Sequence, residues 1–143
     1  MKNSYATGSV SATVTSLSGA VYGYGGGLVG YNNTGLLTNC YAVGQVSVYA
    51  QAGTGSSTAY AGGLLGFASK GTVTDCYRSS SQGFTLSQNG SVTYAATNTS
   101  GTEQSMSTLQ SATFQRDTLR LPSSYWSFGN GAHPTLKNVA SER

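Results

Sequence analysis

Apolar residues along this chain gather in short runs that end at Gly or Asn. Examples are residues 27–30, 36–43 and 46–49. Short runs bounded by turn-forming residues are typical of β-strands, whereas an amphipathic helix repeats its apolar residues every three or four positions over a longer stretch. The pattern therefore predicts an all-β chain with little helix.

The same pattern returns after 36 residues. Residues 24–41 align with 60–77 at this shift with nine of eighteen positions identical, and residues 3–11 align with 39–47 with six of nine identical. A further shift of 36 residues from Cys76 reaches Ala112 in unrelated sequence, so the array of repeats is expected to end before that point. The predicted organisation is a repeat region over 1–100, with a half unit at 3–23 and units at 24–59 and 60–95, and a C-terminal capping segment at 101–143.

Two architectures accommodate two or three short strands in 36 residues: a blade of hairpins or one coil of a solenoid. A hairpin blade needs two-residue turns such as Asn-Gly, and the units contain none. The sequence therefore favours a right-handed parallel β-helix, in which equivalent residues of successive coils lie above one another. The variable stretches at 12–23 and 48–57 are expected to be outward loops.

This register predicts columns of equivalent residues along the stack. We expect the repeated glycines to adopt positive φ at coil corners, and Asn39 and Asp75 to share the left-handed backbone that Asn and Asp tolerate. Tyr5, Tyr41 and Tyr77 are expected to lie in one line along the stack, which we call the tyrosine column. The predicted structural pairs are Gly27 with Gly63, Leu28 with Leu64, Gly30 with Gly66, Cys40 with Cys76, and Tyr41 with Tyr77.

Charge is scarce, at 8% of residues against roughly 25% in an average soluble protein. Identical charges stacked in adjacent coils would repel, so the scarcity fits a stacked repeat. The seven Lys and Arg residues are scattered without the basic stripe that nucleic acid requires. No apolar run approaches the roughly 18 residues of a membrane span. We therefore expect neither nucleic-acid binding nor membrane insertion.

Catalytic and metal-binding chemistry lack the necessary residues. The four acids show no pairing in the aligned units, and His133 is the single histidine. Calcium binding by Gly-rich repeats requires an Asp in each turn, which GGGLVG does not have. We expect no catalytic residue, no cofactor and no metal. The acids are Asp75, Glu103, Asp117 and Glu142.

The two cysteines lie one period apart and are expected to be neighbours on adjacent coils. Small buried thiols are favoured for Cys40 and Cys76, because stacked side chains run parallel whereas a disulfide needs Cβ atoms about 3.8 Å apart. A disulfide, or a metal or redox role, stays open at this point.

Tyrosines are the candidate ligand contacts. They lie in or next to the variable stretches, and exposed aromatic rings on a rigid sheet can stack on sugar rings or anchor a protein partner. Half-buried packing within strands is the alternative interpretation. The candidates are Tyr22, Tyr24, Tyr49 and Tyr60, with Tyr31 beside them.

Residues 26–47, GGLVGYNNTGLLTNCYAVGQVS, resemble the GLUG motif, a bacterial repeat named for its Gly-Leu-any-Gly core. The core recurs at residues 28–30 and 64–66. The tail resembles the segment that often closes such arrays, with Leu109, Thr113-Phe114, Trp126 and Pro134-Thr135-Leu136 in order. The resemblance implies a β-helical segment of a large secreted or surface-anchored bacterial protein, adhesin-like or beside a protease module.

An open coil end exposes backbone groups and core, so a cap is expected. A short helix over 103–114 is expected, with Thr102 as N-cap, and Trp126, Phe128 and Leu136 are expected to cover the last coil, with Pro134 in the same cap. Asn3 begins in the middle of a unit without comparable cover, so we expect further repeats of the parent chain on that side.

The sequence therefore predicts a non-catalytic segment of a secreted or surface-exposed bacterial repeat protein. Its expected role is an adhesin-like binding or stalk module, with a host or matrix protein or a glycan as partner. The alternatives are a passive structural spacer next to a protease or other enzymatic domain, and a fragment of a polysaccharide-active β-helix protein.

Overall fold

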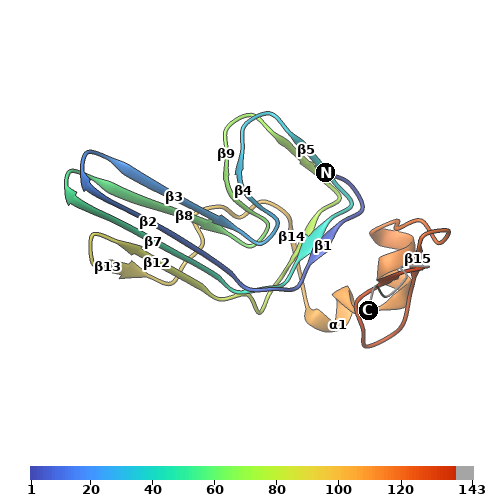
Figure 1. Cartoon of the computed structure of the whole chain (residues 1–143). Helices are drawn as coiled ribbons and strands as arrows, with labels where there is room; N and C mark the ends of the chain where they lie inside the picture. Colours follow the sequence, from blue (N-terminus) through green and yellow to red (C-terminus); the bar gives the residue numbers. More distant parts are fainter. Residues whose placement is uncertain (138–143) are drawn as a thin grey trace, which may run out of the picture.

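The computed structural model describes residues 1–137, and β-strands dominate it (Figure 1). The predicted all-β class is confirmed. The first three turns of chain contain β1 (Tyr5–Ala6), β2 (Val10–Ser18), β3 (Val21–Gly26), β4 (Val29–Asn32), β5 (Leu36–Thr38), β6 (Tyr41–Ala42), β7 (Val46–Thr54), β8 (Ser57–Gly62), β9 (Leu65–Ala68), β10 (Thr72–Thr74) and β11 (Tyr77–Ser79). They are followed by β12 (Phe84–Gln88), β13 (Ser91–Thr93), β14 (Thr102–Gln104), the α-helix α1 (Met106–Leu109), the π-helix η1 (Phe114–Thr118), β15 (Trp126–Ser127) and β16 (Thr135–Leu136).

Strands of the first and second turns pair in parallel with the predicted 36-residue register, whereas β12 of the third turn pairs with β7 at a shift of 38 residues. The Leu28 amide donates to the Leu64 carbonyl across the same two turns (3.0 Å). The repeat in the sequence is therefore a repeat in space, with like residues side by side. The register pairs Tyr5 with Tyr41, Val10 with Val46, Tyr24 with Tyr60, Val29 with Leu65, Leu37 with Val73, and Tyr41 with Tyr77.

Each of the first two turns has a long two-layered arm and a smaller loop (Figure 1). Strands β2, β7 and β12 form one layer, β3 and β8 form the other, and one hydrophobic cluster joins them. Residues 12–23 and 48–57, which we expected to be loops, are therefore largely strand. Every second residue from Val46 to Ala52 is small, apolar and buried, and this alternation places one face of β7 in the core.

The left-handed backbone predicted at Asn39 and Asp75 is confirmed, with φ of 54° and 49°, and Asn3 adds a third equivalent at 53°. The expectation of positive φ at the motif glycines is wrong, because none of them has it. Their small size is needed for close approach instead. A Cβ at Gly27 would overlap the carbonyl oxygen of Gly63 on the next turn.

The last turn is shorter than the others. Gly62 and Asn98, which are 36 residues apart in the sequence, still form a β-bridge. Tyr77 pairs with Thr102, which is only 25 residues further along the chain, so the loop of this turn is 11 residues shorter. The chain crosses directly at Gly101, close to the Leu64 side chain. In addition, β13 folds back antiparallel on β12. Within the described part of the chain, strands therefore close this end of the stack beside β7 and β11, while β9 and β10 pair along one edge only.

The helix expected at 103–114 starts later than predicted. Residues Thr102–Gln104 form β14 and pair with β11, and Ser105 is the N-cap of α1, where its hydroxyl accepts from the Thr108 amide at 3.1 Å. Thr102 was a plausible cap by composition, but pairing with an available strand edge satisfies its backbone instead.

In the predicted capping segment, β14 does pair with the last turn. The part from α1 to β16, called the cap below, lies beside the tyrosine column and not over that end of the stack, contrary to our expectation (Figure 1). Its core contains Leu109, Phe114, Leu119 and Leu121, which pack on the buried Tyr41. The physical reason is that the tyrosine column points away from its sheet and offers the cap a large apolar surface. The last six residues of the predicted capping segment lie outside the described residues.

Candidate functional site

Four aromatic rings form one cluster at the junction of the arm and the loop. Tyr24 stacks on Tyr60 with ring centroids 5.2 Å apart, and Tyr31 stacks on Phe67 at 5.6 Å. The two stacks meet edge to face, with Tyr24 and Tyr31 at 5.1 Å and Tyr60 and Phe67 at 4.9 Å. We call these four residues the aromatic face.

The repeat itself builds this cluster. Tyr24 and Tyr60 are register partners in β3 and β8, and Tyr31 and Phe67 are register partners in β4 and β9. Each stack is therefore a consequence of parallel pairing one period apart. Burial, with smaller contributions from neighbouring tyrosines, raises the pKa of Tyr24, so its phenol stays neutral.

The predicted ligand-contact tyrosines divide over two surfaces. Tyr24 and Tyr60 belong to the aromatic face, and Tyr22 lies two residues before Tyr24 on the same side of β3, with 51% of its surface exposed. Tyr49 points out of the other layer of the arm, since its neighbours in β7 face the shared core. The sequence interpretation missed Phe67, although the alignment of Phe67 with Tyr31 was a usable signal.

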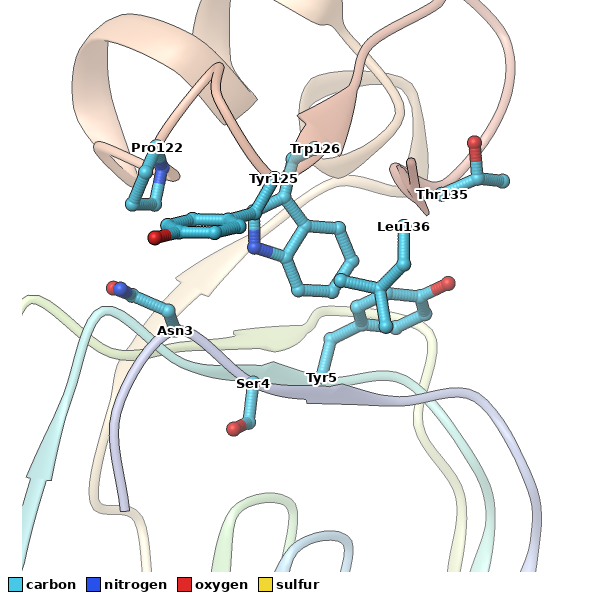
Figure 2. A pocket seen from close by; sticks show the side chains of 8 residues that line it. All are labelled: Asn3, Ser4, Tyr5, Pro122, Tyr125, Trp126, Thr135 and Leu136. Carbon is cyan, nitrogen blue, oxygen red and sulfur yellow. The ribbon is translucent and has the colours of Figure 1, made fainter. Parts of the chain in front are cut away.

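A second aromatic site lies between the cap and the first turn (Figure 2). Figure 2 shows Tyr125, Trp126 and Leu136 of the cap above Asn3, Ser4 and Tyr5 of the first turn. The cavity volume is about 850 Å³, and its lining is mostly apolar. The predicted cap residues Trp126 and Leu136 line it, and the Tyr5 hydroxyl donates to the Pro134 carbonyl at 2.7 Å. The eight lining residues are Asn3, Ser4, Tyr5, Pro122, Tyr125, Trp126, Thr135 and Leu136.

His133 joins the cap to the tyrosine column. Its Nδ1 is hydrogen-bonded to the hydroxyl of the buried Tyr41 at 2.7 Å, and its ring lies 5.7 Å from that of Tyr5. Burial lowers the pKa of His133 below its ordinary value of 6.5. The neutral imidazole is therefore the form that the folded cap favours.

A pH dependence of stability follows from His133. Because its pKa is lower in the folded chain, the unfolded chain binds more protons as the pH falls through 6.5. We expect the melting temperature to decrease between pH 7.5 and 5.5, measured by circular dichroism. His133→Gln should flatten this profile, because His133 is the single histidine of the chain. An unchanged slope in the variant would contradict the assignment.

Cys40 and Cys76 are register neighbours, and both are buried and free. Their Sγ atoms donate to the carbonyls of Thr38 (3.1 Å) and Thr74 (3.2 Å). The hydrogen bond with Cys40, together with burial, raises the pKa of the Cys76 thiol. Both side chains are buried in the core of the loop against Leu37 and Leu64, so they fill space there and have little access to reactants.

The described acids are dispersed. Arg78 binds Glu103 at 2.9 Å, Arg116 binds Asp117 at 2.7 Å, and Asp75 occupies its left-handed corner. The Arg116 guanidinium lowers the pKa of Asp117. Within residues 1–137, no group of three His, Cys, Asp or Glu side chains could hold a metal ion. Glu142 lies outside the described residues.

The fold and its surfaces define a β-rich repeat module with exposed aromatic residues. Residues 21–48 match a family model described as the GLUG motif, and this range runs from β3 into β7. The chain therefore carries a GLUG motif, as predicted. No curated protein and no solved structure matches the chain. None of the helices in residues 1–137 has the length and apolar character needed to cross a bilayer.

Proposed function

We propose that this chain is a non-catalytic, adhesin-like binding module of a secreted or cell-surface bacterial repeat protein. In this proposal its parallel turns are part of a right-handed parallel β-helix, and the aromatic face contacts a neutral glycan. The observation that carries the proposal is the aromatic face itself, a set of two stacked ring pairs that the repeat builds at the junction of the arm and the loop.

The chemistry of sugars favours such a surface. A pyranose ring presents C–H groups on one face, and these groups pack on an aromatic ring while the hydroxyls keep their contact with water. Tyr31 has 46% of its surface exposed, so part of the cluster is open to a ligand. The ordered stacks hold the rings in place before binding, which reduces the entropy lost on association.

The distribution of charge supports a neutral partner and a binding role. Glu103 and Asp117 are each engaged by an arginine, so neither carboxylate is positioned as a free acid or base. Lys and Arg number seven in 143 residues and form no cluster, which gives little attraction for a polyanion. A host or matrix protein is the other partner class that an exposed aromatic patch fits.

Glycan binding is tested by titrating the chain with a panel of neutral oligosaccharides and following amide chemical shifts by NMR. Tyr31→Ala should weaken binding by about two- to tenfold, because an aromatic contact contributes roughly 0.5–1.5 kcal/mol and 1.4 kcal/mol equals a factor of ten. Tyr49→Ala is the matched control on the opposite side of the arm and should retain the affinity.

Three outcomes would count against the proposal. Equal losses in both variants would show that the aromatic face is not the contact surface. Binding of matrix proteins without any glycan would favour the protein partner. Absence of any binder at millimolar ligand would favour the passive spacer, for which replacing surface tyrosines changes only solubility.

A further inference from the structure

The two ends of the stack differ in how their strand edges are satisfied. At the C-terminal end β13 pairs with β12, β14 pairs with β11, and Asn98 bridges Gly62, so of the second turn's strands only β9 and β10 keep an edge without any strand or bridge partner in the described part of the chain. At the other end β1, β2, β3 and β4 each pair along one edge only. Within residues 1–137, no strand pairs with the second edge of these four strands.

Strand β2 shows what this open edge exposes. Its residues Val10, Ala12 and Val14 are only partly buried, whereas their register partners in β7 are fully buried. β2 is nine residues long and contains no charge and no proline. Such an edge lacks the usual protection against pairing with another chain, so it is suited to receive a strand.

The direction of the free amides can be derived from the pairing. The Val10 amide donates to the Gln45 carbonyl at 2.8 Å, and alternate residues of a strand point their amides to opposite edges. The amides of Ser11, Thr13 and Thr15 therefore point to the open side.

A glycine at the first turn gives independent support. A Cβ at Gly44 would overlap the carbonyl of Gly8, which lies one turn earlier, so close packing of turns explains the glycine at 44. Gly8 occupies the equivalent position, yet a Cβ added there would meet no atom within 4 Å, and the φ of Gly8 is not positive. A further turn packed against Gly8 would explain why this position is also a glycine.

The pocket beside the cap continues the tyrosine column on the same side. Tyr5 stacks on Tyr41 at 5.1 Å with the rings nearly parallel, and Tyr5 also lines the pocket. Tyr125 and Leu136 line the pocket from the cap and are 67% and 52% exposed. One more ring at the same spacing would fall among these side chains.

We propose that the open face of the first turn and this pocket dock one further 36-residue turn of the same repeat, in parallel register, with its aromatic residue in the pocket. The face is continuous with the existing interface between turns. Asn39 already donates from Nδ2 to Oδ1 of Asn3 at 3.2 Å, so an added turn would extend this contact by another step. A second copy of the chain, related by a two-fold axis, would pair β2 antiparallel and would not continue the register.

The proposal is tested by fusing a second copy of residues 37–72 directly before Met1, which preserves the period of 36 residues. The amides of Ser11, Thr13 and Thr15 should then exchange with solvent at least about tenfold more slowly, measured by NMR. The amides of Val10 and Val14, which are bonded in both proteins, serve as internal controls. Trp126 is the single tryptophan, and its fluorescence should become less accessible to acrylamide.

Two control extensions separate pairing from filling of the pocket. A scrambled 36-residue extension should protect neither the amides nor Trp126. An extension with Ser at the position copied from Tyr41 should protect the amides but leave Trp126 open to quenching.

A synthetic peptide of residues 37–72 added in trans gives a second format that does not depend on folding of the fusion. It should produce a saturable change in Trp126 emission. The absence of protection in both formats would overturn the proposal. So would a dimeric unfused chain whose β2 amides are already protected, since that result identifies a second copy as the occupant. These readouts are independent of glycan binding on the aromatic face.

Discussion

Leu64→Ala is expected to lower the free energy of unfolding by about 3 kcal/mol, because a fully buried leucine leaves a cavity when it is truncated. Leu64 has 0% of its surface exposed and packs with Leu37, Cys40 and Leu65 in the core of the loop. The short last turn crosses at Gly101 on its other side, so the surroundings have little freedom to collapse.

Leu28→Ala is the matched control, since Leu28 is the same motif residue one turn earlier. It packs against the same cluster but is only partly buried, so its truncation should lower the free energy of unfolding by about 1 kcal/mol. Urea denaturation followed by circular dichroism measures both values. Equal losses would mean that the core at the first turn is as enclosed as the core at the second, contrary to the open face.

The repeat made part of this fold predictable, because identical residues at a fixed period specify which strands pair and in which register. The pairing of Tyr5 with Tyr41 and the left-handed backbone at Asn39 follow from that single fact. The alternation in Val46–Ala52 is typical of a strand facing a core, although we expected residues 48–57 to be a loop because they vary between the units. Variable sequence is therefore compatible with a strand: the inward residues of β2 and β7 also differ, as at Val14 and Ala50, but they stay small.

The rest could not be predicted because it depends on contacts between distant segments. Thr102 satisfies local rules for an N-cap, yet the free edge of β11 makes it a strand residue. Nothing in the local sequence specifies which surface the cap covers. The position of the cap depends on its contacts with the tyrosine column, in which Tyr41 is hydrogen-bonded to His133, more than ninety residues further along the chain. Two of the candidate tyrosines, Tyr24 and Tyr60, lie in the aromatic face, and their role in binding stays a prediction, while finding Phe67 requires the register to be followed across both turns.

Gly44→Ala is expected to lower the free energy of unfolding by about 2 kcal/mol, because an added Cβ would overlap the Gly8 carbonyl and force a shift of backbone. Relief is restricted on both sides of Gly8. The Ala6 carbonyl accepts from the Val43 amide at 3.0 Å, and the Val10 amide donates to the Gln45 carbonyl at 2.8 Å. Moving the loop away therefore strains the ladder that joins the first two turns.

Gly8→Ala is the matched control, with a change of at most about 0.5 kcal/mol in the chain as it stands, because a Cβ there meets no atom within 4 Å. Chemical denaturation of both variants measures the difference. Equal effects would show that the glycine at this position is needed for its backbone freedom and not for close packing. In the chain extended by residues 37–72, the added turn would lie against Gly8 as Gly8 now lies against Gly44. Gly8→Ala should then become as destabilising as Gly44→Ala.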